Sequence, residues 1–366
     1  MKKVLFFIPT LGAGGAERAL VKLVNNLPQD KYDISVKSLF NTGIYINELN
    51  KNISYSYVFK RAFKGNVHIF KIFSPSFLYK IMIREDYDVI VSYLEGPTTR
   101  IASGCNDKNT KLINWVHTSA ETKDVFLSSY RNQDEFKKCS EKYNKTVFVA
   151  KTAQDRFEQV FPNISINPIV IYNPFDREKI LNRSKEESDV MSDDFNIVSI
   201  GRLMPVKGFE RLIKAISKIN SRNVHLYIIG EGSLRNFLQE EIDNNGLKSK
   251  VTLVGFRENP YPMLKESDLY VCSSHREGYS TTVVESLVLG VPVLTTNCSG
   301  MTEILGENQE FGMIVDNNDE ALIQGLERIL NDNQLYAYYK EMAQIRGLDF
   351  ELMKSVEPVD RMLENI

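Results

Sequence analysis

Three loops of the chain combine glycine with charged or hydroxyl side chains, and each directly follows a short apolar run that is typical of a buried strand. They span residues 9–18, 201–208 and 274–285. Glycine lets a backbone approach an anion closely, and a helix that starts after such a loop offers free N–H groups to that anion. The three loops are therefore the first candidates for a ligand site.

The loop 201–208 carries two cations between glycines, in the sequence Gly-Arg-Leu-Met-Pro-Val-Lys-Gly. The guanidinium of Arg202 presents a planar fork to phosphate oxygens, and Lys207 adds a mobile point charge. An ordinary surface loop can also hold such residues. The position between an apolar run and a helical pattern favours a diphosphate site.

The loop 274–285 carries two carboxylates eight residues apart, Glu277 and Glu285. Ser280 is a typical helix cap, so we expect a helix that runs to about Leu289, with Glu277 before it and Glu285 in its second turn. Carboxylates accept paired hydrogen bonds from vicinal hydroxyls, which suits sugar rings. A glutamate on a helix usually faces solvent, but Glu285 lies among valines and leucines, where an unpaired charge is costly.

The loop 9–18 contains Gly12, Gly14 and Gly15, but Glu17 occupies the position where a dinucleotide motif needs its third glycine. The expected strand 34–39 also lacks an acidic end residue, so a nicotinamide site is disfavoured. A tight turn needed only for packing remains the alternative. His117 follows another expected strand, where it is either functional or an ordinary hydrogen-bonded histidine.

Apolar runs alternate with amphipathic helical stretches along almost the whole chain, which predicts parallel sheets covered on both faces. The fold class is therefore α/β, with one doubly wound, Rossmann-like domain in each half. The expected strands lie at 4–8, 34–39, 89–92, 112–116, 147–149 and 169–171 in the first half. Those of the second half lie at 197–200, 225–229, 251–254, 269–272, 292–295 and 312–315.

Composition narrows the class of protein. The 366 residues carry a net charge of −2, but residues 1–175 carry +8 and the remainder −10. No apolar run approaches the ~20 residues that a membrane-spanning helix needs. The four cysteines are far apart in the sequence and form no CxxC pair. This usage fits a reducing compartment and argues against disulfides or a thiolate metal site.

Taken together, these motifs resemble the retaining GT-B glycosyltransferases of the large group 1 family. The resemblance covers essentially the whole chain and rests on the three loops, His117 and further short motifs. These are Gly230-Glu231-Gly232, Gly255-Phe256, Gly290-Val291-Pro292-Val293 and Tyr172-Asn173-Pro174. It implies two facing Rossmann-like domains with a cleft between them. The expected limits are 1–173 for an acceptor-side domain, 174–349 for a nucleotide-sugar domain, and 350–366 for a helix that crosses back.

The resemblance also implies a role for each matching residue. Arg202 and Lys207 hold the diphosphate of a nucleoside-diphosphate sugar, with UDP as the expected nucleotide. Glu285 binds the ribose and Glu277 the hydroxyls of the donor sugar, while His117 lies near the reacting carbon. Further donor contacts are expected from Gly14, Gly15, Gly278, Tyr279, Ser280 and Thr281. The segment Tyr279-Ser280-Thr281 departs from the Phe-Gly-Leu of many members, which leaves the donor sugar open.

The expected reaction uses no metal ion and no cofactor. Asp86-Tyr87-Asp88 looks like the metal-binding DxD of another glycosyltransferase class. It precedes an expected strand and therefore lies at the wrong end for the site. Elsewhere the sequence shows no clustered His, Cys and Asp ligands. We interpret the DxD as a solvated turn.

Residues 49–84 contain no Asp or Glu but seven Lys or Arg, interleaved with eight Tyr or Phe. This pattern suits an anionic membrane surface, with Lys60, Arg61, Lys64 and Lys71 as contacts. Nucleic acid is not expected as a partner, because no nucleic-acid module appears. The alternative is that the aromatic residues are core and the lysines are solvated.

The sequence thus predicts a cytoplasmic glycosyltransferase of surface polysaccharide or glycolipid assembly, peripheral at the inner face of the membrane. Two alternatives stay open, since a fold does not fix a function. One is a sugar-nucleotide epimerase or hydrolase on the same scaffold. The other is a non-catalytic partner subunit of a glycosyltransferase, although the intact charged residues of the loops argue against it.

Overall fold

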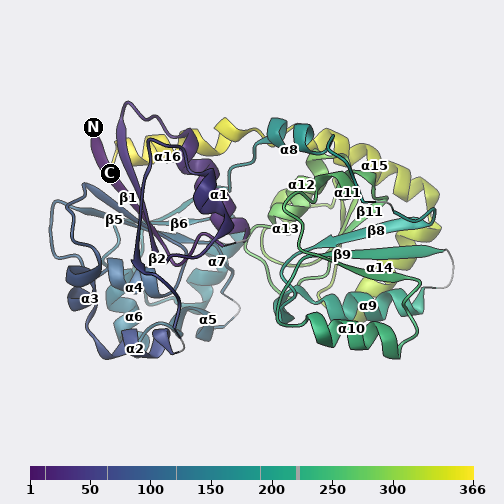
Figure 1. Ribbon diagram of the computed structural model, residues 1–366, viewed down its shortest axis with the longest axis horizontal. Coiled ribbons are helices and arrows are strands. Elements are labelled where there is room, and N and C mark those ends of the chain that lie inside the picture. The colour runs from purple at the N-terminus through teal and green to yellow at the C-terminus, as the bar shows by residue number, and fades with distance from the viewer. Residues whose placement is uncertain (13, 64, 121, 190, 220–222) are drawn as a thin grey trace. The chain divides into compact units, whose positions relative to one another are not determined.

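The computed structural model describes residues 1–12, 14–63, 65–120, 122–189, 191–219 and 223–366 (Figure 1). The spatial contacts between backbone positions divide the chain into two compact units. Unit 1 comprises Met1–Pro174 and Met353–Ile366, and unit 2 comprises Phe175–Leu352. Each unit is built on its own parallel sheet, and each is described by itself below. No helix in the described ranges is long and apolar enough to cross a bilayer.

Unit 1 contains a seven-stranded sheet in the order β3-β2-β1-β4-β5-β6-β7, with every paired ladder parallel. Its strands are almost wholly buried at the centre, because apolar residues face both helical layers. The strands are β1 (Lys2–Ile8), β2 (Tyr32–Phe40), β3 (Ser54–Phe59), β4 (Val89–Tyr93), β5 (Lys111–Val116), β6 (Lys145–Phe148) and β7 (Pro168–Val170).

Helices connect these strands and lie on both sides of the sheet (Figure 1). They are α1 (Gly15–Asn26), α2 (Asn66–Ile72), α3 (Pro75–Met82), α4 (Pro97–Ala102), α5 (Asp124–Leu127), α6 (Gln133–Ser140) and α7 (Lys151–Val160), with a short 3-10 helix at Ile44–Glu48. The core below α2, α3 and α4 includes Phe70, Leu78 and Ile101, all nearly inaccessible to solvent.

The last helix, α16 (Leu352–Glu364), packs against unit 1 beside the N-terminus (Figure 1). Lys2 donates from Nζ to the carbonyl of Leu363 at 2.6 Å, and the Tyr32 hydroxyl donates to Asp360 at 2.7 Å. Lys31 forms ion pairs with Asp360 and Glu364. The chain end is thereby held to the first two strands by contacts more than 300 residues apart in sequence.

Unit 2 contains a six-stranded parallel sheet in the order β10-β9-β8-β11-β12-β13. The strands are β8 (Phe195–Ile200), β9 (Val224–Ile229), β10 (Val251–Gly255), β11 (Leu269–Cys272), β12 (Val293–Thr296) and β13 (Met313–Val315). The helices are α8 (Arg177–Arg183), α9 (Phe209–Lys218), α10 (Arg235–Asn244), α11 (Tyr261–Glu266), α12 (Thr281–Val288), α13 (Met301–Leu305), α14 (Asp319–Asn331) and α15 (Asn333–Gly347), with a 3-10 turn at Pro205–Lys207.

The α/β prediction is confirmed, and each expected strand overlaps one of the strands observed. β3 was missed. Its sequence, SYSYVF, alternates polar and aromatic residues at an edge of the sheet and none of its residues is fully buried. It therefore lacks the continuous apolar run by which the central strands were recognised.

In both sheets the strand order reverses at one point. In unit 1 the chain runs from β1 outward to β3 and then returns to β4 beside β1. In unit 2 it runs from β8 outward to β10 and returns to β11 beside β8. Ligands of open α/β sheets bind beyond the carboxyl ends of the strands at such a switch point. The predicted loops 9–18, 201–208 and 274–285 follow β1, β8 and β11.

Candidate functional site

The loop after β8 and the loop after β11 are bonded to each other at the switch point of unit 2. His275 donates its backbone N–H to the carbonyl of Val206 at 2.8 Å, and the Ser273 hydroxyl donates to the carbonyl of Lys207 at 3.0 Å. Gly208 has a φ of +61°, and a Cβ there would lie 2.3 Å from the carbonyl oxygen of Ser273. Only glycine allows this approach.

That approach brings the two charged residues of the predicted donor site together. Lys207 and Glu277 are 70 residues apart in the sequence, and Nζ lies 2.7 Å from Oε1. The Ser274 hydroxyl donates to the same oxygen at 2.5 Å. Within the described residues, Oε2 of Glu277 has no hydrogen-bond partner, and Nζ of Lys207 makes one hydrogen bond of the three it can donate. The pair thus keeps one acceptor and two donors for a ligand.

The charge state of Lys207 is set by two opposing effects. Burial disfavours the ammonium form, but the Glu277 carboxylate beside it outweighs burial and raises the pKa of Lys207 above its usual value. Arg202 lies near enough to oppose this effect slightly, and its own side chain is exposed. Lys207 is therefore cationic at neutral pH, as the binding of a diphosphate requires.

Arg211, on α9, holds the loop that carries Glu277, although sequence reasoning did not identify it. Its buried guanidinium donates to the carbonyls of Ser273 and Ser274 at 2.7 and 2.6 Å. It also donates to Asn317 at 2.8 Å. Three fixed partners leave the loop little freedom, so the position of Glu277 depends on a residue 66 positions earlier in the sequence.

Helix α12 starts after the loop, as predicted, with Ser280 accepting a hydrogen bond from the N–H of Val283 at 3.5 Å. Glu285 lies in its second turn and is only 1% exposed. The Tyr261 hydroxyl on α11 donates to Oε1 of Glu285 at 3.0 Å. A buried carboxylate is tolerated because it has hydrogen-bond partners. Tyr261 was not recognised in the sequence, since a lone tyrosine gives no spacing signal.

The remaining predicted donor contacts of unit 2 lie directly before and at this helix start. Gly278 and Tyr279 complete the loop, while Ser280 and Thr281 form the cap and the first helical residue. Tyr279 is nearly buried, and its ring lies 6.2 Å from that of Phe175. These four residues and Glu277 share one loop, so the structure brings them together with Lys207.

The glycine loop of unit 1 leads from β1 into α1, which begins at Gly15 with Gly14 as its cap. Leu11 anchors the loop, since its N–H donates to the carbonyl of Thr42 at 3.0 Å. A Cβ on Gly14 would lie 2.1 Å from Oε2 of Glu17. Gly14 is buried and Gly15 exposed, so the second glycine presents its backbone to solvent at the helix start.

His117 follows β5, in the sheet of unit 1, and lies in a cluster of aromatic rings. Its ring centre is 4.5 Å from that of Tyr93 and 6.4 Å from that of Trp115. Three buried polar atoms in this cluster have no partner among the described residues: Tyr93 OH, Trp115 Nε1 and His117 Nε2. Burial lowers the pKa of His117 from 6.5 to about 3. The imidazole is therefore neutral at physiological pH.

A strained turn after β4 positions the backbone at His117. Leu94 has a φ of +116°, which a non-glycine residue rarely adopts, at a cost of about 1–3 kcal/mol. Glu95, the next residue, accepts the backbone N–H of His117 on Oε2 at 2.9 Å. The local sequence Leu94-Glu95-Gly96-Pro97 does not reveal this contact. In the structure, Glu95 supports the backbone at the predicted catalytic histidine.

The basic segment 49–84 divides between core and surface. Phe70 is in the core, and the partly buried Phe59 and Phe63 pack against it and each other with ring distances of 5.5 to 6.1 Å. Lys60 and Arg61 are exposed and Lys71 is half-buried, whereas Lys64 lies outside the described residues. The interpretation as core aromatics is therefore correct for part of the segment only.

The DxD sequence does not lie with the candidate site. Asp88 precedes β4 at its amino end, where its carboxylate accepts the backbone N–H of Lys3 at 2.7 Å. In the described ranges, no three His, Cys, Asp or Glu side chains lie together as a metal site would need. The prediction of a metal-free reaction stays a prediction.

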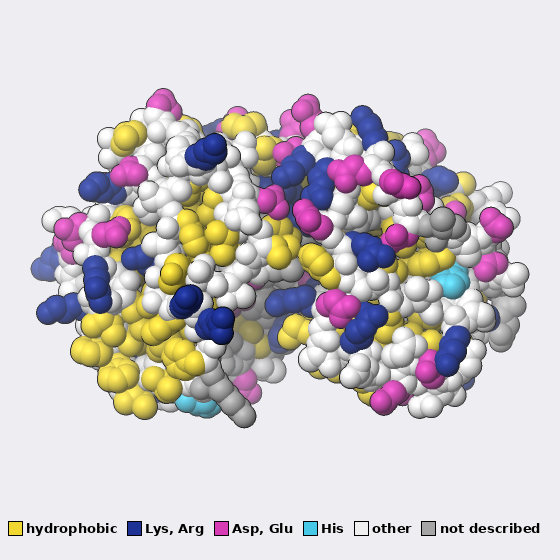
Figure 2. All heavy atoms as spheres, viewed as in Figure 1, with side chains coloured by type: hydrophobic (Ala, Val, Ile, Leu, Met, Phe, Trp, Pro, Cys, Tyr) yellow, Lys and Arg dark blue, Asp and Glu magenta, His cyan; other side chains and the backbone are white. Residues whose placement is uncertain are grey.

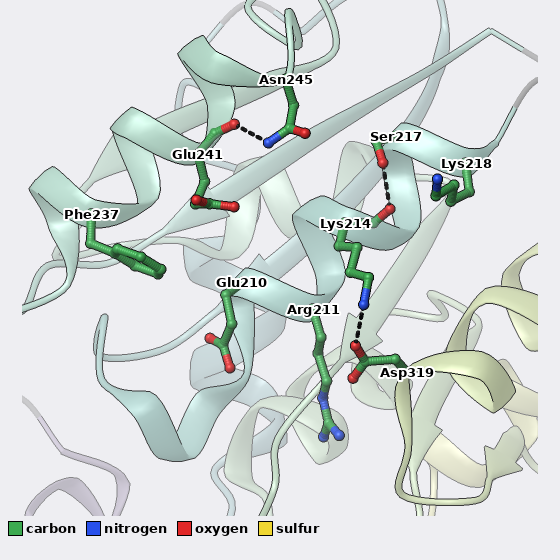
Figure 3. A pocket seen from close by; sticks show the side chains of 9 residues that line it. All are labelled: Glu210, Arg211, Lys214, Ser217, Lys218, Phe237, Glu241, Asn245 and Asp319. Atoms are coloured by element: carbon green, nitrogen blue, oxygen red, sulfur yellow. Dashed lines mark hydrogen bonds and ion pairs between the residues drawn. The ribbon is translucent and has the colours of Figure 1, made fainter.

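A pocket of about 520 Å³ lies on another face of unit 2, between α9 and α10 (Figure 3). Its charges are largely compensated, since Lys214 pairs with Asp319 at 2.9 Å (Figure 3). Of its lining residues, Glu210 and Arg211 also contact the loop after β11. The predicted donor residues do not line it. We therefore place the candidate site at the two bonded loops and not in this pocket.

The chain is similar to known glycosyltransferases. Residues 182–346 match the family model described as glycosyl transferases group 1. That stretch contains the two bonded loops and α12. The family match therefore covers all the charged residues predicted to hold the donor.

Two curated relatives from Campylobacter jejuni extend the similarity to the whole chain. One is N-acetylgalactosamine-N,N'-diacetylbacillosaminyl-diphospho-undecaprenol 4-alpha-N-acetylgalactosaminyltransferase, 29% identical over 97% of both chains. The other is an alpha-1,4-N-acetyl-D-galactosaminyltransferase that acts on GalNAc-alpha-(1->4)-GalNAc-alpha-(1->3)-diNAcBac-PP-undecaprenol, 27% identical over 96% of this chain and 95% of the relative.

Among solved structures, Anabaena HepE in complex with UDP-glucose superposes with a TM-score of 0.77. It is 18% identical and covers 100% of both chains. Similarity at this level of identity speaks for the fold alone. It agrees with the predicted GT-B assignment of two Rossmann-like sheets.

Proposed function

Because this chain belongs to the group 1 glycosyltransferases, we propose that it transfers a sugar from a nucleoside diphosphate to a hydroxyl of a lipid-linked glycan, with retention at the anomeric carbon. The observation that carries the proposal is the Lys207–Glu277 pair at the switch point of unit 2. A cation for the diphosphate and a carboxylate for sugar hydroxyls lie in contact there. A nucleotide sugar presents those two groups next to each other.

UDP is the proposed nucleotide, because HepE, which shares the fold, binds UDP-glucose. Within unit 2, we assign Glu285 to the ribose hydroxyls and Lys207 to the diphosphate, the roles that the family resemblance implies. Arg202 is exposed and close to Lys207, so it adds charge at the outer side of the diphosphate. Gly278 and Tyr279 precede the start of α12, where backbone N–H groups favour an anion.

The proposed reaction breaks the bond between the anomeric carbon and the phosphate oxygen. The acceptor oxygen bonds to the same face of that carbon, and the acceptor proton passes to the leaving phosphate. Charge develops on the diphosphate, so the cations Lys207 and Arg202 stabilise the transition state more than the ground state. Oε2 of Glu277 accepts hydroxyls of the transferred sugar and is not a nucleophile in this route.

His117 acts as a neutral imidazole in this proposal. Its pKa of about 3 excludes an imidazolium role at neutral pH, so it serves as a hydrogen-bonding group for the transferred sugar. Gly14 and Gly15 are proposed as further donor contacts, as the family resemblance implies. These roles in unit 1 rest on the family resemblance and on the neutral, orphaned Nε2 atom.

The proposed acceptor is carried on an undecaprenyl-type lipid, because both Campylobacter relatives are named for such substrates. Action on a lipid-linked glycan places the protein peripherally at the cytoplasmic face of the membrane. The exposed cations Lys60 and Arg61, with Lys71 and Lys64, are the proposed contacts with anionic headgroups.

Substitution of Glu277 by Gln tests the function. The amide keeps the size of the side chain but weakens both the pairing with Lys207 and the binding of hydroxyls. We expect transfer to fall by about 100–1000-fold, while UDP still raises the melting temperature of the variant. Glu240→Gln, an exposed carboxylate on α10, is the matched control and should transfer normally. Normal transfer by the Glu277 variant would refute the assigned role.

Product analysis separates the alternatives. Retention predicts an α-linked product from an α-linked donor, which the anomeric coupling constant in proton NMR reports. An epimerase or hydrolase would convert the donor without an acceptor. A non-catalytic subunit would bind UDP but convert no donor until a second protein is added.

A further inference from the structure

Helices α2 and α3 of unit 1 turn large apolar side chains toward solvent. Ile69, Ile72, Phe73, Phe77 and Ile81 are between 41% and 70% exposed, and we call them the α2–α3 apolar face. The rings of Phe73 and Phe77 stack on each other at 5.2 Å. Figure 2 shows hydrophobic side chains gathered over these helices. Monomeric proteins rarely expose contiguous apolar surface without a use for it.

The same helices also bury apolar residues on their inner side. Phe70, Leu78 and Met82 are at most 6% exposed and belong to the core of unit 1. The core-facing residues of these helices are thus already buried, and the α2–α3 apolar face is a second, separate set of apolar residues. These helices therefore carry apolar residues both toward the core and toward solvent, which is typical of a helix with an apolar environment on each side.

The backbone at the corner between α2 and α3 is satisfied by the protein rather than by water. Arg100 donates to the carbonyls of Phe70 and Phe73, both at 2.8 Å. Arg131 donates to the carbonyls of Lys71 and Ile72, at 2.5 and 2.6 Å. Four consecutive carbonyls at the end of α2, which ordinarily bond to solvent, thus have guanidinium partners.

Both arginines are held in place by Glu135 on α6. Arg100 is 1% exposed and pairs with Glu135 through two hydrogen bonds, at 2.7 and 3.1 Å. Glu135 also accepts the backbone N–H of Arg131 at 2.8 Å. On the other side of the corner, Ser74 caps α3 by accepting the N–H of Phe77 at 3.2 Å. Pairing of these carbonyls lowers the penalty of bringing this corner of the backbone into a low-dielectric medium.

We propose that the α2–α3 apolar face inserts into the boundary between headgroups and acyl chains of an anionic membrane. The neighbouring charge selects that occupant, because Lys60, Arg61 and Lys80 are exposed near it and residues 49–84 contain no carboxylate. A second copy of the chain would bring the same positive charge against itself. Insertion goes beyond the electrostatic contact proposed above. It rests on the proposed function only in that a lipid-linked acceptor would give the protein a reason to bind a membrane.

Vesicle flotation of the full chain tests the insertion. The triple variant Ile72→Ser, Phe73→Ser, Phe77→Ser removes apolar area and leaves all charges and the arginine contacts in place. We expect its affinity for vesicles of phosphatidylcholine with 30% phosphatidylglycerol to fall by on the order of 100-fold. Phe237→Ser, in unit 2, removes a ring that is 45% exposed and should bind as the parent does. Unchanged binding by the triple variant would overturn the proposal.

The salt dependence of binding and the depth of the side chains in the bilayer distinguish insertion from electrostatic attraction to the surface. Headgroup attraction weakens with ionic strength, whereas the apolar contribution persists, so part of the binding should survive 0.5 M salt. Ile72→Trp places an indole at the corner, and brominated lipids should quench it in anionic vesicles. Absence of quenching, or a dimer in solution that the triple variant dissociates, would count against a membrane occupant.

Transfer to a water-soluble acceptor separates this proposal from the proposed function. The triple variant should transfer normally to such an acceptor, because the substituted residues lie outside the bonded loops of unit 2. If the parent transfers sugar but does not bind vesicles, insertion fails and the function stands. If the parent binds vesicles but transfers nothing, the function fails and insertion stands.

Discussion

The two units place their candidate residues at the same topological point but satisfy the polar groups there in different ways. In unit 2, Lys207, Glu277 and Arg211 form a chain of charged and hydrogen-bonded partners. In unit 1, His117 and Trp115 lie in an aromatic cluster, and their ring nitrogens Nε2 and Nε1 have no partner in the part of the chain that the structure describes. An ionic site prepared in advance suits a diphosphate, whereas neutral polar atoms suit sugar hydroxyls. Under the proposed function, the ionic groups of unit 2 suit the charged part of the donor, and the neutral groups of unit 1 suit hydroxyls.

The largest effect is expected at the cation of unit 2. Lys207→Ala removes the partner of Glu277 and a counter-charge of the leaving diphosphate. We expect kcat/KM to fall by about 1000-fold, or ~4 kcal/mol of transition-state stabilisation, with weaker UDP binding as well.

Lys214→Ala is the matched control for this variant, since Lys214 lies on α9 and pairs with Asp319 on the surface. Steady-state kinetics and a UDP thermal shift on both variants measure the difference. If Lys207→Ala keeps parental kcat/KM, the diphosphate does not bind where the comparison between the units places it.

The second effect concerns the support of the ionic site. Arg211→Ala leaves the buried carbonyls of Ser273 and Ser274 without donors, which should cost about 3 kcal/mol of unfolding free energy. Transfer should fall as well, because the loop of Glu277 loses its anchor. Denaturant unfolding and kcat measure the two parts. Arg235→Ala, an exposed residue that pairs with Glu231, should change neither.

The third effect tests the neutral site of unit 1 through pH. The pKa of His117 is lowered from 6.5 to about 3 by burial, so the unfolded chain takes up a proton first on acidification. Its contribution to stability is complete above pH 6.5 and is lost as the pH falls toward 3. Between these pH values, the free energy of unfolding of the parent should fall by up to ~1.4 kcal/mol per pH unit relative to that of His117→Gln. Parallel stability curves for the two proteins would show that the histidine is not buried as described.

The fold followed from the sequence to a large extent, because buried parallel strands are continuous apolar runs between helices. β8 and β11 are such runs, and the loops after them held the predicted ligand residues. β3 was missed for the opposite reason, since an edge strand alternates and its tyrosines were interpreted as part of a surface. The signal that identifies a strand is therefore the burial of both its faces.

The site was predictable where charge and glycine share one loop, and not where a distant residue supports that loop. Arg211 and Tyr261 contact the loop and helix that follow β11 from other elements, and nothing in their local sequence marks them. The role of Glu95 was not predicted, because its partner is a backbone N–H 22 residues away. Such partners are set by the strand order, which a single sequence does not display. Spatial support is the part that only the structure supplies.

The smallest effect is the one expected from removing divalent metal. Lys207 and Arg202 already bring two positive charges to the place where the proposal puts the diphosphate, which is the electrostatic task of a divalent cation in other transferases. Transfer measured after treatment with EDTA should therefore stay within about twofold of the untreated rate. Lys207→Ala tested with added Mg²⁺ sharpens the comparison, because a metal that replaced the lysine would restore activity. Strict dependence of the parent on metal would show that the cations of unit 2 do not suffice to balance the charge of the diphosphate.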